Sequence, residues 1–93
     1  MARVIWCNAA LEDLDRIFPF IATHGNQAAR LVAERLIAFG KSLRAFPRRG
    51  GPTCAGCREM TTVPPYILRY EIEEETVFIR SIRHGARRPD QNP

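Results

Sequence analysis

Four residues between positions 58 and 84 have side chains that could act on an anion. Arg58 begins one run of alternating apolar residues, and Arg80, Arg83 and His84 lie on a second run. Guanidinium groups stabilise phosphate charge, and histidine changes its protonation near neutral pH. These groups could support RNA cleavage by a 2′-hydroxyl, a reaction that also needs a second general acid or base. No residue clearly fills that place, so we assign no catalytic residue.

Arg80 instead indicates a binding surface. Strict alternation predicts two faces for its strand, one with Val77, Ile79 and Ser81, the other with Phe78, Arg80, Ile82 and His84. A guanidinium is costly to bury among apolar neighbours unless an anion pairs with it. We therefore expect Arg80 at an edge, a groove or an interface, facing a negatively charged partner.

Two of the four residues also have simpler interpretations. A single histidine at a strand end, such as His84, is more often a hydrogen-bonded structural residue than a catalyst. Arg58 beside Glu59 could form only a cross-strand ion pair, which contributes little at a surface.

The cysteines offer a weaker signal. Cys54 and Cys57 have the spacing of half a zinc site, but no second CxxC or HxxxH follows. Cys7, His24 and His84 could complete a site only if the fold brought them together. A redox pair is a further alternative. We favour an incidental turn and expect no metal and no cofactor.

The elements that position these residues begin with strands. Residues 58–63, 66–72 and 77–84 alternate in polarity, and the acidic residues 73–75 form a turn between the last two runs. Residues 3–7 form a short β-prone run, with Val4 and Trp6 on one face. The paired prolines at 64 and 65 must lie outside the ladder of hydrogen bonds.

Two helices are expected between the first strand and the others. Asn8 resembles an N-cap, and Pro19 predicts either a kink or a helix that ends near Phe18 and restarts. The predicted apolar positions of this helix are Leu11, Leu14, Ile17, Phe18 and Ile21. Gly25 and Asn26 indicate a stop and a new cap, with Gly25 in a left-handed conformation.

The second helix is predicted from residue 27 to about residue 46. Its apolar positions are Ala28, Val32, Leu36, Phe39, Leu43 and Phe46. The loop at 47–56 contains Arg48 and Arg49, which could contact an anion or merely keep the loop soluble, the interpretation we favour. The predicted fold is α+β, in the order β-α-α-β-β-β, with a helical hairpin packed on a small, mostly antiparallel sheet.

Composition sets broad limits. We expect one domain over residues 1–93, with a frayed tail at about 89–93. The formal net charge of +4 suits nucleic acid or an acidic polypeptide, although it also fits an ordinary surface. The N-terminus resembles neither a secretory signal nor a membrane span, so we expect a cytoplasmic protein without membrane contact.

The order and spacing of short segments across nearly the whole chain resemble the RelE/ParE superfamily of bacterial type II toxins, with more similarity to the ParE branch. The segments are Trp6 and Ala9; Leu14 and Ile17; Ala28 and Ala29; Leu43 and Pro47; residues 58–60; residues 65–67 with Tyr70; residues 77–80; and residues 84–89.

The resemblance implies a toxin neutralised by an acidic, ParD-like antitoxin, with no small-molecule substrate. ParE-like members inhibit DNA gyrase, and we expect that function here, which makes an enzymatic activity of this chain doubtful. The alternative is a RelE-like ribosome-dependent mRNA endonuclease, for which Arg58, Arg80, Arg83 and His84 would be the candidate residues. Arg58 and the basic position on the last strand match functional arginines of RelE-like nucleases, but their lysine-rich patch is absent. A second alternative is a non-toxic nucleic-acid-binding module.

The predicted partner surface is a groove with an apolar floor and an arginine rim. An acidic amphipathic segment could fold into such a groove as it binds. The residues that we expect to contact the antitoxin or the target are Arg58, Tyr70, Arg80, Arg83, His84 and Arg87.

Overall fold

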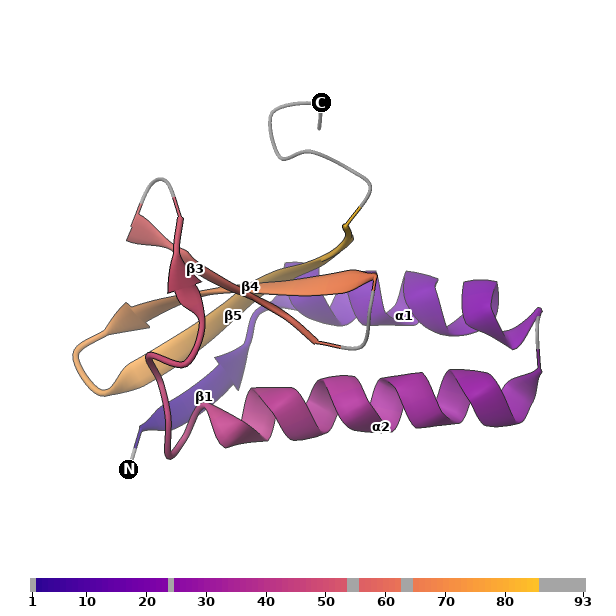
Figure 1. Cartoon of the computed structure of the whole chain (residues 1–93), viewed down its shortest axis with the longest axis horizontal. Coiled ribbons are helices and arrows are strands. Elements are labelled where there is room, and N and C mark those ends of the chain that lie inside the picture. The colour runs from indigo at the N-terminus through magenta and orange to yellow at the C-terminus, as the bar shows by residue number, and fades with distance from the viewer. Residues whose placement is uncertain (1, 24, 54–55, 63–64, 86–93) are drawn as a thin grey trace.

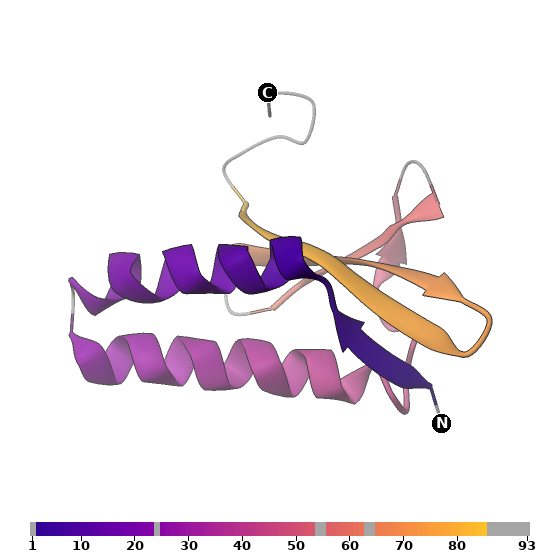
Figure 2. The ribbon, with the colours of Figure 1, turned by 180° about the vertical axis from the view of Figure 1, so that it is seen from behind.

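The computed structural model describes residues 2–23, 25–53, 56–62 and 65–85. Strand β1 (Arg3–Trp6) leads into helices α1 (Asn8–Ala22) and α2 (Asn26–Ser42). Four strands follow: β2 (Gly51–Pro52), β3 (Arg58–Thr61), β4 (Tyr66–Glu73) and β5 (Thr76–His84). Figure 1 shows the two helices side by side along the sheet, and Figure 2 shows the same layers from behind.

The sheet has five strands in the order β1-β5-β4-β3-β2. β1 runs parallel to β5, and every other neighbouring pair is antiparallel. The α+β class, the helical hairpin and the mostly antiparallel sheet are therefore confirmed. The predicted order lacked β2, because two residues within a Gly- and Pro-rich loop have no alternation by which a strand could be recognised.

The core lies between the helices and one face of the sheet. Its fully buried side chains include Leu36 and Leu43 of α2, Leu68 and Tyr70 of β4, and Val77 and Ile79 of β5. Gly40 allows α2 to approach β1 closely, because a Cβ at this position would lie 2.4 Å from Trp6 Cζ2. Val4 and Trp6 are both half-buried and pack against the core, as predicted.

The first helix differs from its prediction at its start and in its exposed positions. Cys7, not Asn8, is the N-cap residue. Of the two alternatives at Pro19, an end near Phe18 is wrong because α1 runs on to Ala22, and a kink stays a prediction. Leu11 and Phe18 are exposed, at 44% and 42%, while the half-buried positions of the predicted stripe are Leu14, Ile17 and Ile21. The apolar stripe of α1 is thus wider than the surface that the sheet and α2 cover.

The second helix is shorter than predicted. It ends at Ser42, and Phe46 lies beyond it with 65% of its surface exposed. Ala29 rather than Ala28 is buried, so the inward stripe is Ala29, Val32, Leu36, Phe39 and Leu43. Gly25, not Asn26, is the N-cap residue, and its φ of 128° is a backbone conformation that residues with a Cβ rarely adopt.

β5 does not alternate strictly, because Arg80 forms a β-bulge. Tyr70 pairs with Ile79 and Arg69 with Ser81, so Arg80 has no opposite residue. An extra residue in one strand reverses the alternation beyond it. Ile82 is therefore buried with the core, and its predicted position on the Phe78 face is wrong.

Candidate interaction surface

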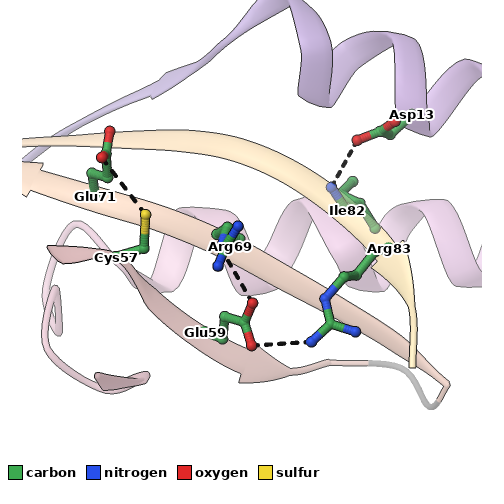
Figure 3. A network of polar contacts seen from close by, with 7 residues as sticks. All are labelled: Asp13, Cys57, Glu59, Arg69, Glu71, Ile82 and Arg83. Carbon is green, nitrogen blue, oxygen red and sulfur yellow. Dashed lines mark hydrogen bonds and ion pairs between the residues drawn. The ribbon is translucent and has the colours of Figure 1, made fainter. Parts of the chain in front are cut away.

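The face of the sheet away from the helices carries a cluster of one carboxylate and two guanidinium groups. Glu59 lies opposite Arg69 in the register of β3 and β4. Arg83 Nη2 donates a hydrogen bond to Glu59 Oε1 at 3.2 Å (Figure 3). Arg69 Nε lies 3.3 Å from Glu59 Oε2, an ion pair whose alignment falls short of a hydrogen bond. All three side chains are mostly buried. With two guanidinium groups and one carboxylate, the cluster has a net charge of +1 that is only partly exposed to solvent.

A second cluster surrounds the bulged residue. Arg80 Nε donates to Glu71 Oε2 at 2.5 Å, and its Nη1 lies 3.5 Å from Cys7 Sγ. The guanidinium carbon lies 5.3 Å from the centre of the Phe78 ring. Arg80 is 45% exposed and pairs with Glu71 within the chain, so part of its charge is met internally. Its contact with an external acidic partner stays a prediction.

Glu71 also accepts a contact from the other side. Cys57 Sγ lies 3.6 Å from Glu71 Oε1 (Figure 3). The hydrogen bond from Arg80 holds the pKa of Glu71 below its ordinary value, and in turn raises the pKa of Arg80. Burial, together with the negative charge of Glu71, raises the pKa of the Cys57 thiol. A raised pKa keeps the sulfur protonated and disfavours thiolate chemistry at this position.

Arg58 points to the loop after α2 rather than to an anion. Its Nε donates to Gly50 O at 2.8 Å, and its Nη2 donates to Arg48 O at 3.3 Å. The cross-strand ion pair between Arg58 and Glu59 does not form, because adjacent residues of a strand point to opposite faces. Tyr70 is fully buried, and its hydroxyl accepts a hydrogen bond from Gly50 N at 2.8 Å. Arg58 and Tyr70 therefore position the loop.

His84 lies at the far end of β5, where its ring makes an edge contact with the ring of Tyr66 at 5.8 Å between centroids. The register places His84 opposite Tyr66 and Arg58 opposite Tyr70, four residues away along β4. At ~3.3 Å per residue this separates them by roughly 13 Å. The structure thus does not bring the four candidate nuclease residues together, and Arg87 lies outside the described residues.

Some features of this surface had no signal in the sequence. Asp13 Oδ2 accepts a hydrogen bond from Ile82 N at 2.9 Å, which ties α1 to β5 (Figure 3).

In the described part of the chain, no three His, Cys, Asp or Glu side chains gather as metal ligands. Cys54 and His24, which the zinc hypothesis would use, lie outside that part. None of the described helices is long and apolar enough to cross a membrane.

Comparison with known proteins identifies the family. A family model described as the ParE toxin of the type II toxin-antitoxin system parDE matches residues 4–89. This chain belongs to the ParE toxin family. The resemblance to the RelE/ParE superfamily is therefore confirmed, and with it the assignment as a toxin of a type II toxin-antitoxin system, whose partner is an antitoxin.

Two relatives extend the comparison. The chain is 41% identical over 87 residues to "Toxin RelE2" of Caulobacter vibrioides, covering 94% of this chain and 99% of that protein. It also resembles a chain of the solved structure "Chromosomal ParDE TA system from P. aeruginosa", with a TM-score of 0.80 and 20% identity. That match covers 90% of this chain and 96% of the other, and it supports the fold.

Proposed function

We propose that this ParE-family toxin acts in the cytoplasm by inhibiting DNA gyrase and is neutralised by a cognate antitoxin. The observation that carries the choice of target is that the cations expected in a nuclease already have partners within the chain. Arg58 bonds to loop carbonyls, Arg80 to Glu71, and Arg83 to Glu59. A cation paired with a carboxylate stabilises an additional phosphate less well, so this surface is better suited to docking than to phosphodiester cleavage.

The target is tested by supercoiling assays with purified gyrase. We expect the full chain to inhibit supercoiling and to increase the fraction of cleaved DNA. Its addition to programmed ribosomes should leave the messenger intact. Unimpaired supercoiling together with codon-linked mRNA cleavage would overturn the proposal.

A second candidate, the ribosome-dependent mRNA endonuclease, is favoured by one observation. The relative with 41% identity is named RelE2. The family match favours both toxin functions over a non-toxic nucleic-acid-binding module.

We further propose that the antitoxin contacts the outer face of β5 around Arg80. Arg80 lies beside the Phe78 ring, so the surface combines a partly exposed cation with apolar area, as an acidic amphipathic segment requires. Arg80→Glu should weaken co-purification with the antitoxin, whereas Arg30→Glu on the exposed side of α2 should not.

A second variant tests the contact between Arg80 and the antitoxin without removing the guanidinium group. Glu71→Gln releases the Arg80 guanidinium from its carboxylate, and we expect antitoxin affinity to stay the same or increase, as measured by calorimetric titration. Unchanged affinity of Arg80→Glu, in a protein with an unaltered thermal unfolding midpoint, would count against this surface.

A further inference from the structure

The end of α2 and the loop after it carry positive charge without negative charge. Residues 41–58 contain five of the cations of the chain and neither Asp nor Glu. Four of these cations are exposed, and we call them the cationic lip: Lys41, Arg44, Arg48 and Arg49. Within the described residues no carboxylate forms an ion pair with any of the four, in contrast to Arg69, Arg80 and Arg83.

An exposed aromatic ring lies within the cationic lip. Phe46 has 65% of its surface exposed, the highest fraction among the exposed large apolar side chains. Together with Pro47, Arg48 and Arg49 it lines an open hollow of about 620 Å³. Proteins that hold single-stranded nucleic acid combine these two features, since cations follow the phosphates while an aromatic ring stacks on a base.

The lip is built on a fixed support. Arg49 Nη1 donates to Ser42 Oγ at 2.9 Å, and its guanidinium carbon lies 5.2 Å from the centre of the Phe39 ring. Arg58 donates to two carbonyl groups of the loop, and the buried Tyr70 hydroxyl accepts from Gly50 N. A loop whose backbone is held in this way loses little backbone entropy when it binds, which favours affinity.

We propose that the cationic lip binds a single-stranded segment of nucleic acid, with one base stacked on Phe46 and the flanking phosphates on the arginines. The inference does not depend on which target the toxin inhibits. An acidic polypeptide is a poorer match, because the lip offers one isolated ring among cations rather than an apolar strip. DNA and RNA share the required chemistry, and the experiment below includes both.

The test is fluorescence anisotropy of the full chain with labelled single-stranded DNA, single-stranded RNA and duplex DNA of one sequence. We expect tighter binding to a single strand than to the duplex, with affinity falling as salt increases. Arg44→Glu combined with Arg48→Glu should reduce the slope of log K against log salt by about 1.4, because each single-strand phosphate contact contributes ~0.7. Phe46→Ala should weaken binding about 5-fold or more and leave the slope unchanged.

The matched control is Arg30→Glu combined with Arg35→Glu, which changes the net charge equally on the exposed side of α2. This control should lose much less affinity than the lip variant, and circular dichroism should show that all variants fold. An equal loss of affinity in the control would show that binding depends only on the net charge of the chain, and it would overturn the proposal. Full binding by Phe46→Ala, or tighter binding of polyglutamate than of the oligonucleotides, would overturn it as well.

Discussion

At the scale of single residues, the Glu71 carboxylate contacts two other side chains, one through each oxygen. Oε2 accepts a hydrogen bond from the Arg80 guanidinium, and Oε1 lies near the Cys57 thiol. Because Arg80 lowers the pKa of this carboxylate in the folded state, the unfolded chain takes up its proton at a higher pH. The stabilisation is therefore present above the ordinary pKa of 4.5 and is lost as the pH falls through the folded value.

We expect Glu71→Gln to remove part of this acid sensitivity. Urea denaturation between about pH 3 and pH 7 should show a smaller loss of stability for the variant below about pH 4.5 than for the unchanged chain. Glu73→Gln, in the exposed position at the end of β4, is the control and should retain the full pH dependence. Identical curves for Glu71→Gln and the unchanged chain would contradict this role.

Gly50 shows how closely the loop is fitted to the core. A Cβ at Gly50 would lie 2.7 Å from the Tyr70 hydroxyl oxygen and 2.9 Å from Glu59 O, whereas a Cβ at Gly51 meets nothing within 4 Å. We expect Gly50→Ala to lower the free energy of unfolding by about 1–3 kcal/mol through overpacking. Gly51→Ala should change it little, and equal effects of the two substitutions in chemical denaturation would refute this reading.

At the scale of elements, the contact between α2 and β1 depends on Gly40. Alanine usually stabilises a helix relative to glycine by about 1 kcal/mol. At Gly40 the added Cβ would lie 2.4 Å from Trp6 and 3.1 Å from Ile79, so we expect Gly40→Ala to be destabilising by about 1–3 kcal/mol. Thermal denaturation checks the sign, and Ala38→Gly at an exposed position of the same helix measures propensity alone. A stabilised Gly40→Ala variant would show that the helix can move away from Trp6.

The elements also show what the sequence can predict. The 3.6-residue and two-residue periodicities predicted both helices, the first strand and the three later strands, because local polarity follows burial. The bulge at Arg80 could not be predicted, since a single inserted residue depends on the pairing with β4 and leaves no local signal. Beyond it, the predicted face of Ile82 was therefore reversed.

The candidate site was predicted less well for a related reason. Sequence identifies cations, but the carboxylate or carbonyl group that each one meets depends on the register between strands. Arg80 meets Glu71 and Arg83 meets Glu59, both from other strands. The reach of Arg58 across to the loop at Arg48 and Gly50 likewise depends on tertiary packing.

At the scale of the whole molecule, charge is divided between regions. Acidic residues concentrate at 12–15 and 73–75, while residues 41–58 are purely cationic among charged types. The cations of β5 pair with carboxylates, whereas those of the cationic lip form no ion pair among the described residues. Under the two proposals above, one chain would present different regions to an antitoxin and to a nucleic acid.

The parallel pairing of β1 with β5 has a consequence for biosynthesis. Arg3 lies opposite Thr76, and Trp6 opposite Ile79, so the first strand finds its neighbour only after more than 70 further residues have been made. Contacts so distant along a chain form late and slowly. A nascent chain that has not yet emerged beyond residue 79 lacks the β5 residues with which its first strand pairs. The five-stranded sheet, and every surface built on it, is therefore complete only after synthesis has passed these residues of β5.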